Sequence, residues 1–229
     1  MRDIVASDIG GTHARFCTAR IARGRVLELG PATTLHTADY PDLISCWRAY
    51  TIARGGTPPD ALALALACPI GGETLQLTNH DWVIRPASLA RDLGVAQLTL
   101  VNDFGAVAHA VSHLTPAHLR HITGPDAPRV EGVTTLLGPG TGLGVAQLLR
   151  RKGVSHIIEC EGGHADFAPR DTVEDAILAY LRARHGRGSN ERIVSGPGLA
   201  NIYAALAAIK GIAVPPFEHK TLWDLAIAG

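Results

Sequence analysis

The first apolar positions of the chain form two short runs separated by a glycine turn. Residues 4–9 are mostly apolar, and a β pattern resumes over 14–21, with Gly10-Gly11-Thr12-His13 between the two runs. Residues 14–25 show no helical stripe of apolar positions, so they predict a second strand rather than a helix. The segment SDIGGTHARF (7–16) therefore predicts a β-hairpin with a Gly-Thr turn, unlike a P-loop or a Rossmann loop, which opens a helix.

The next ninety residues alternate between helical and strand patterns. Residues 41–56 predict a helix stopped by two glycines, 61–67 a buried strand, and 88–95 a short helix. The segment QLTLVNDFGAVAHAV (97–111) predicts a strand that leads directly into a helix. Asn102 and Asp103 fall at the carboxyl end of this strand, where open α/β sheets bind ligands. Asp103 also lies near the predicted helix start, where a carboxylate is favoured.

The second half of the chain repeats the opening pattern. VTTLLGPGTGLGVAQLLRR (133–151) again predicts strand, Gly-Thr turn and strand, and 156–159 predicts a third strand. Asp171 and Glu174 predict a capping box for a helix through His185. Residues 189–198 predict a loop, 199–211 a helix, and 215–229 no regular element.

The repeated hairpin predicts an α/β protein of two lobes. The Pro-, His- and Gly-rich stretch 115–132 is the best candidate for the link between them. We therefore expect a smaller lobe over 1–115 and a larger, truncated lobe over 116–229, with the active cleft between them.

Composition narrows the class of protein. The chain has 229 residues, of which 46% are hydrophobic and 18% charged, and 21 basic residues balance 21 acidic ones. This balance does not suggest a nucleic-acid binder. Four scattered cysteines, no signal-peptide pattern and no apolar run of membrane-spanning length favour a cytoplasmic protein without membrane contact.

The two Gly-Thr turns are candidate phosphate sites. Glycine lets a phosphate approach backbone N–H groups closely, and two such turns can hold a nucleotide tail between them. Asp8, just before the first turn, is a candidate Mg²⁺ ligand, directly or through water. The alternative reading of Asp8 is a turn residue that hydrogen-bonds its own backbone.

Two further groups of polar residues carry candidate chemistry. Asp103 is a candidate base for a hydroxyl group that accepts a phosphoryl group, although a helix cap explains it equally well. Glu161, His164 and Glu191 have the donors and acceptors that suit vicinal sugar hydroxyls. For that third set, a metal site or a surface loop without a role are the alternatives.

Taken together, six segments resemble the bacterial glucokinase family of the sugar kinase, Hsp70 and actin superfamily. They are SDIGGTHARF, LTNHDW, LVNDFGAVAHAV, LGPGTGLGVAQL, EGGHADFAP and ERIVSGPGLANIY, in the family's order and spacing over almost the whole chain. The resemblance is to the branch without the cysteine cluster of the repressor/ORF/kinase group. It implies a two-lobed actin-like (ribonuclease H-like) ATPase fold in which the second lobe is incomplete.

The resemblance implies phosphorylation of glucose by ATP, the first step of glycolysis. Asp103 matches the family's general base. The sugar-binding residues implied are Asn102, Glu161, His164 and Glu191, together with Thr78 and Asn79. The nucleotide site implied is Ser7, Asp8, Ile9, Gly10, Gly11 and Thr12 with Gly138, Gly140, Thr141 and Gly142, and Asp8 with Mg²⁺. A homodimer is also implied.

The chain departs from the family in length, because family members are longer by about a third of this chain. We hypothesise that the 229 residues are part of a longer glucokinase; an active, folded protein with an intact mass near 24.1 kDa would contradict this. Alternative functions are a sugar-binding regulator without transfer activity, a kinase for another hexose, and an actin-like or Hsp70-like ATPase. His13 stands where the family often has Asn, and we expect the turn to tolerate it.

Overall fold

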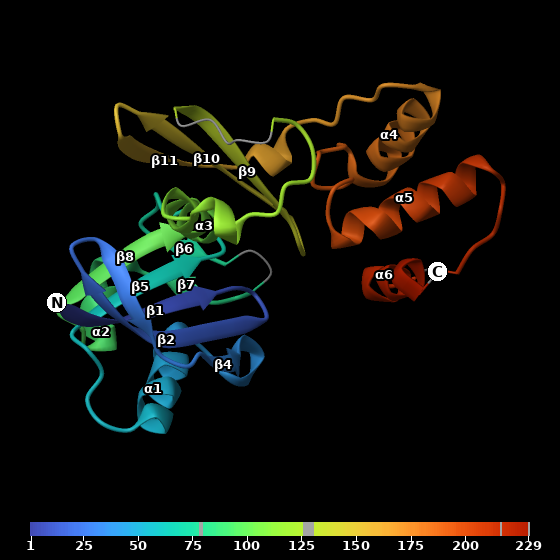
Figure 1. Ribbon diagram of the computed structural model, residues 1–229. Coiled ribbons are helices and arrows are strands. Elements are labelled where there is room, and N and C mark those ends of the chain that lie inside the picture. Colours follow the sequence, from blue (N-terminus) through green and yellow to red (C-terminus); the bar gives the residue numbers. More distant parts are fainter. Residues whose placement is uncertain (78–79, 126–130, 216, 229) are drawn as a thin grey trace. The chain divides into compact units, whose positions relative to one another are not determined.

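The computed structural model describes residues 1–77, 80–125, 131–215 and 217–228 (Figure 1). The chain divides into two compact units, Met1–Val111 and Ser112–Gly229, each with a sheet and helices of its own.

The sheet of the first unit is centred on the predicted hairpin. Its strands β1 (Arg2–Ile9) and β2 (His13–Ala22) pair antiparallel, and Ile9 faces Ala14 next to the turn. β5 (Ala61–Leu66) pairs parallel with β1, and β8 (Gln97–Asn102) pairs parallel with β5. The strand order is β3-β2-β1-β5-β8, with β4 beside β2. The edge strands β3 (Arg25–Leu29) and β4 (Thr33–His36), and the ribbon of β6 (Leu75–Gln76) and β7 (Val83–Ile84), were not predicted.

Two helices cover one face of this sheet (Figure 1). α1 (Leu43–Arg54) begins at a capping box between Asp42 and Ser45 and ends at Gly55. α2 (Pro86–Leu93) ends at Gly94, whose left-handed φ of 69° suits glycine. Buried apolar residues of β1, β2 and β5 pack against these helices in one hydrophobic core. The core fixes the sheet from which the candidate site residues project.

Aromatic side chains form the centre of that core. Phe16 stacks on Tyr50 with 4.8 Å between the ring centroids, and Trp47 packs against both rings. The Trp47 indole N–H donates to the carbonyl of Leu93 at 3.0 Å, so its polar atom is satisfied inside the core. These contacts join the hairpin to both helices.

The second unit has a three-stranded antiparallel sheet and a group of helices. The strands are β9 (Gly132–Pro139), β10 (Leu143–Arg151) and β11 (Val154–Cys160), in the order β11-β10-β9. The helices are α4 (Thr172–His185), α5 (Gly196–Ile209) and α6 (His219–Ala228). Ile177, Leu181 and Ala205 form the core between α4 and α5.

The remaining elements are one helix, α3 (Asp103–Ser112), and three 3-10 turns. The turns are η1 (Thr37–Asp39), η2 (Pro116–His118) and η3 (Gly162–His164).

Three predictions in the second unit were wrong. α5 begins at Gly196 rather than Leu199, because Ser195 caps it by accepting from the Gly198 N–H at 2.9 Å. A helix, α6, occupies residues predicted to have no regular element. The capping box of α4 is only half formed: Asp171 accepts from the Glu174 N–H at 2.9 Å, but the Glu174 carboxylate accepts from the backbone N–H of Arg170 instead of that of Asp171.

In the part of the chain that the structure describes, no helix has the length and the apolar character needed to span a membrane.

Candidate functional site

Parallel pairing brings the first Gly-Thr turn and Asp103 to the same edge of the sheet. In the register of the sheet, Ile9 lies beside Leu66, and Leu66 lies beside Asn102. All three residues stand at the carboxyl ends of their strands. The turn that follows β1 and the helix α3 that follows β8 therefore begin at the same edge of the sheet, with β5 between their two strands.

Hydrogen bonds from one buried threonine hold the first turn in shape. The Thr37 hydroxyl donates to the Gly11 carbonyl at 2.7 Å, and the Thr37 N–H donates to the Thr12 carbonyl at 3.1 Å. The Gly10 N–H donates to the carbonyl of His13 at 2.9 Å. Within the described residues, the N–H groups of Gly11 and Thr12 donate to no other group. The turn thus keeps its carbonyls paired and offers N–H groups to an anion.

The residues before the turn support it from the strand. The Ser7 hydroxyl donates to the carbonyl of Ala63 at 3.2 Å, and Ile9 is fully buried in the core. Asp8 is half exposed, and its carboxylate accepts from the Arg15 guanidinium at 2.9 Å. The side chains of Ser7 and Ile9 are therefore engaged within the first unit, and β1 is paired with β2 on one side and with β5 on the other.

Asn102 caps α3, the helix that begins with Asp103. The Asn102 side-chain oxygen accepts from the N–H groups of Phe104 at 3.0 Å and Gly105 at 3.2 Å, and its amide donates to the carbonyl of Cys68. The Phe104 N–H also donates to the Asp103 carboxylate at 2.8 Å. The helix cap that competed with the functional interpretation of Asp103 is therefore largely supplied by its neighbour Asn102.

The environment of Asp103 makes its carboxylate more basic than an ordinary aspartate. Burial raises its pKa above the usual 3.8, and the negative charge of Asp8 raises it further. Hydrogen bonds from the Phe104 N–H and the Asn102 side chain oppose this rise without cancelling it. A raised pKa at the end of a strand is the property expected of a general base.

The second Gly-Thr turn packs against the start of α5. The Gly140 N–H donates to the Gly142 carbonyl at 2.8 Å, which closes the turn between β9 and β10. The Gly140 carbonyl accepts from the Gly196 N–H at 2.8 Å. Gly138 and Thr141 belong to the same hairpin. This second candidate phosphate turn is thereby tied to the amino-terminal end of a fourteen-residue helix.

Glu161, His164 and Glu191 come together in the second unit, although Glu191 follows Glu161 by thirty residues in the chain; we call these three residues the acid–histidine cluster. His164 Nδ1 lies 3.7 Å from Glu161 Oε2, and His164 Nε2 lies 3.6 Å from Glu191 Oε1. The Glu191 N–H donates to the Gly163 carbonyl at 2.9 Å, which fixes the two loops together. Three side chains with many acceptors and exposed ends suit a polyhydroxylated ligand.

Two residues of these sites gave no recognisable signal in the sequence. Thr37 is an isolated threonine after a short strand, and its partner lies twenty-six residues earlier. Arg187 donates from its Nη2 to the His164 carbonyl and from its Nε to the Asp166 carboxylate at 2.7 Å. Both contacts depend on tertiary folding, so a local pattern cannot reveal them.

Thr78 and Asn79, which the resemblance assigns to the sugar site, lie outside the described residues. The remaining predicted residues fall into two groups, one in each unit. The first turn, Asn102 and Asp103 belong to Met1–Val111, and the second turn and the acid–histidine cluster belong to Ser112–Gly229.

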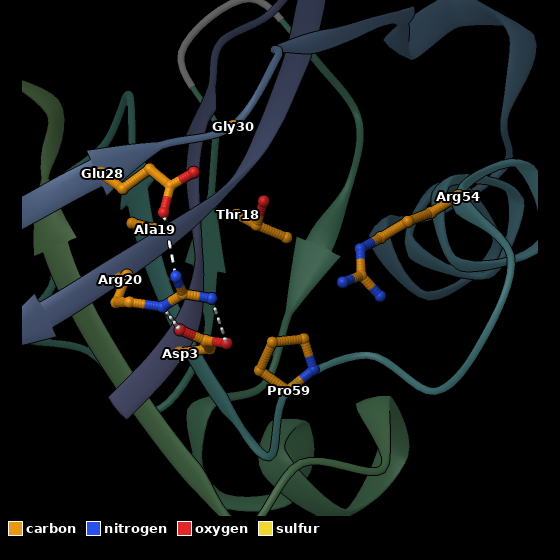
Figure 2. Close-up of a pocket in the computed structure, with 8 residues that line it drawn as sticks. All are labelled: Asp3, Thr18, Ala19, Arg20, Glu28, Gly30, Arg54 and Pro59. Carbon is orange, nitrogen blue, oxygen red and sulfur yellow. Dashed lines mark hydrogen bonds and ion pairs between the residues drawn. The ribbon is translucent and has the colours of Figure 1, made fainter. Parts of the chain in front are cut away.

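A cavity of about 160 Å³ on the first unit lies at the wrong end of the hairpin to be this site (Figure 2). It is lined by Asp3, which faces Arg20 across the strands, whereas Ile9 and Ala14 adjoin the turn. Arg20 bridges Asp3 and Glu28 at 2.9 and 3.0 Å. Two acidic and two basic side chains line the cavity, so their charges cancel and the cavity has no net positive charge to attract a phosphate.

The described residues contain no group of three or more His, Cys, Asp or Glu placed to hold a metal ion. Mg²⁺ in phosphoryl-transfer enzymes needs only one or two carboxylates, because phosphates and water supply the other ligands. The half-exposed Asp8 carboxylate beside the first turn fits that mode of binding.

Comparison with known proteins gives concordant matches. The family model described as Glucokinase matches residues 5–229. The glucokinase of Zymomonas mobilis is 54% identical over 228 residues, which are 99% of this chain and 70% of that protein. The glucokinase of Klebsiella pneumoniae is 38% identical over 226 residues, which are 98% of this chain and 68% of that protein. The crystal structure of a glucokinase from an Antarctic psychrotroph matches with a TM-score of 0.79 at 31% identity, over 100% of this chain and 71% of that one.

Proposed function

The chain belongs to the glucokinase family, and we propose that it transfers the terminal phosphoryl group of ATP to the 6-hydroxyl of glucose, with Asp103 as the general base. The observation that carries the role of Asp103 is its position: a carboxylate of raised pKa stands at the same sheet edge as a turn whose Gly11 and Thr12 N–H groups donate to no group among the described residues. A base and a phosphate-binding turn at one edge of a sheet are what phosphoryl transfer to an alcohol requires.

In this proposal Asp103 takes the proton from the sugar hydroxyl as that oxygen bonds to the terminal phosphorus of ATP, while the bond from this phosphorus to the departing ADP breaks. Phosphoryl transfer depends mainly on positioning and on stabilisation of negative charge. The Phe104 N–H holds one oxygen of the Asp103 carboxylate, which orients the base. Because burial makes the carboxylate more basic, the proton transfer is more favourable than it would be to an exposed aspartate.

The two Gly-Thr turns hold the phosphates of ATP. In this proposal the N–H groups of Gly11 and Thr12 donate to a phosphate oxygen of ATP, and the Thr12 hydroxyl is a further donor. Gly140 has open space where a Cβ would stand, so a phosphate can approach the second turn closely. Mg²⁺ bound with ATP would supply charge neutralisation on the phosphates, and Asp8 is the residue to hold it, directly or through water.

The acid–histidine cluster and Asn102 bind the sugar. Carboxylate oxygens of Glu161 and Glu191 accept from hydroxyl groups, and His164 between them donates or accepts according to its tautomer. A site built from polar groups rejects an analogue that lacks a hydroxyl, because the unpaired partner costs about 1–3 kcal/mol. The lobes over 1–115 and 116–229 would close on the sugar and exclude water, which otherwise competes as the acceptor.

The experiment that tests this function measures ADP release from Mg-ATP without sugar, with glucose, and with mannose, fructose or an amino sugar. We expect release that depends on a hexose and has its highest kcat/KM with glucose. Release without any sugar would indicate an actin-like or Hsp70-like ATPase. A higher kcat/KM with another hexose would correct the substrate. Glucose binding without release would indicate a sugar-binding regulator.

A further inference from the structure

The Glu191 carboxylate contacts both the acid–histidine cluster and the end of the second Gly-Thr turn. Its Oε1 lies 3.6 Å from His164 Nε2, and its Oε2 accepts from the Leu143 N–H at 2.9 Å. Leu143 follows Gly142 directly and is the first residue of β10. One side chain therefore joins two loops to which the proposed function assigns different ligands.

This contact is possible only because residue 142 has no side chain. A Cβ built on Gly142 would stand 2.5 Å from Glu191 Oε2 and 3.2 Å from its carboxyl carbon. The backbone of Gly142 is not in the left-handed region that favours glycine, so close approach of Glu191 is the reason for a glycine here. The atoms in conflict are the far end of a flexible side chain, so an alanine would displace the carboxylate rather than the backbone.

The Leu143 N–H occupies only part of the accepting capacity of Glu191. A carboxylate has about four lone-pair sites, so sugar hydroxyls can bind while the backbone contact persists. A carboxylate that accepts from a fixed backbone N–H is also pre-oriented, which lowers the entropy lost when the sugar binds.

We propose that Glu191 couples the sugar site to the second phosphate turn, and that Gly142 is a positioning residue for sugar binding although it lies in the phosphate turn. This inference rests on the proposed function, since it takes glucose as the ligand of the acid–histidine cluster. Its consequence is that sugar affinity depends on the space at residue 142 in the absence of nucleotide. By the same link, a bound sugar restrains the Leu143 N–H.

The test compares two alanine variants of one turn by calorimetric titration with glucose, without nucleotide. Gly142→Ala should weaken glucose binding about 10- to 100-fold, the effect of losing a hydrogen bond to a charged group. Gly140→Ala is the matched control, because a Cβ there meets nothing within 4 Å and its backbone is also outside the left-handed region. We expect the control to bind glucose as tightly as the unmodified chain, whatever its affinity for ATP.

Equal glucose affinity in Gly142→Ala and in the unmodified chain would overturn the coupling and leave the proposed function intact. Absence of glucose binding by the unmodified chain would instead contradict the proposed function itself. If Gly142→Ala does not fold, amide hydrogen exchange in the unmodified chain decides the question. Glucose should slow exchange at the Leu143 N–H, and an unchanged rate there with saturating glucose would overturn the inference.

Discussion

The hydroxyl of Thr37 donates a hydrogen bond of 2.7 Å to the carbonyl of Gly11, in the middle of the first Gly-Thr turn. Thr37 is fully buried, and its own N–H donates to the next carbonyl of the turn. One residue outside the turn therefore fixes the direction in which the turn presents its N–H groups.

Replacing Thr37 by Val should impair nucleotide binding, because valine keeps the shape and removes the hydroxyl. The unpaired Gly11 carbonyl should lower the free energy of unfolding by about 1–3 kcal/mol. We expect the KM for ATP to rise about tenfold while glucose binding without nucleotide stays unchanged. Urea unfolding and steady-state kinetics measure the two effects. The Thr37→Ser variant retains the hydroxyl and should restore both values towards normal; failure of Ser to do so would contradict the role of the hydrogen bond.

Replacing Asp103 by Asn should stabilise the fold at neutral pH. The pKa of Asp103 is raised by burial and by Asp8, so its contribution to stability is present below the usual 3.8 and lost as pH rises through the folded-state pKa. At neutral pH the ionised side chain therefore destabilises the protein, and the amide removes that effect. The melting temperature of Asp103→Asn should exceed that of the unmodified chain at neutral pH, with a smaller difference in acid.

Asp92 provides the control of opposite sign for that measurement. Its pKa is lowered by a hydrogen bond from the Ser88 hydroxyl and by Arg91. The stability that ionised Asp92 contributes to the fold is present above the usual pKa of 3.8 and is lost as pH falls through the folded-state pKa. Asp92→Asn should therefore lower the melting temperature at neutral pH. A shift in the same direction for both variants would contradict the electrostatic explanation.

His185 should make the second unit sensitive to mild acid. Its Nε2 is buried and has no hydrogen-bond partner among the described residues. Burial and the charges of Arg192 and Arg184 lower its pKa below 6.5, against a smaller opposing effect of Asn201. As pH falls, the His185 imidazole takes up a proton in the unfolded chain before it does so in the folded chain. The stability that neutral His185 contributes to the fold is therefore full above pH 6.5 and is lost as pH falls below that value. Between about pH 7.5 and about pH 5.5, the free energy of unfolding should fall more for the unmodified chain than for His185→Gln. The exposed His156, changed in the same way, serves as the control.

Replacing Arg187 by Ala should weaken sugar binding selectively. The Arg187 guanidinium holds the backbone carbonyl of His164 and the side chain of Asp166, and so fixes the loop that carries His164. We expect the KM for glucose to rise about tenfold and the KM for ATP to stay the same. Arg184→Ala is the matched control, because the side-chain hydrogen bond of Arg184 within the described residues goes to the Tyr180 hydroxyl at 3.4 Å rather than to the acid–histidine cluster. An equal rise in both KM values, or in both variants, would argue against a positioning role.

Local patterns predicted the elements that carry the candidate site. Both Gly-Thr hairpins and the strand that leads into α3 at Asp103 were predicted, because turn chemistry and period-two patterning agree there. The mixed α/β fold class is confirmed by the match to the Antarctic glucokinase structure. The strands β3 and β4 were missed because their exposed edge positions carry little apolar alternation.

The rest depended on tertiary contacts or on signals that compete. Ser195 at the N-cap and Pro197 in the first turn are signals for the start of a helix. The glycines around them favoured a loop, so the first turn of α5 was missed. Three sets of contacts join segments that are distant in the chain. They are the acid–histidine cluster, the hydrogen bonds from Thr37 to the first turn, and the hydrogen bond from Arg187 to the His164 carbonyl. No local period encodes such contacts. Residue chemistry suggested the set Glu161, His164 and Glu191 but left a metal site and a surface loop as alternatives, and the resemblance favoured the sugar site.

The most direct test of the account measures glucose-dependent ADP release from Mg-ATP by the chain and by its Asp103→Ala variant, with glucose binding measured calorimetrically on the same samples. We predict release by the unmodified chain, none by the variant, and similar glucose affinity in both, because Asn102 and the acid–histidine cluster are intact. Near-normal release by the variant would contradict the assignment of Asp103 as the base. Loss of glucose binding along with release would contradict the separation of base and sugar ligands.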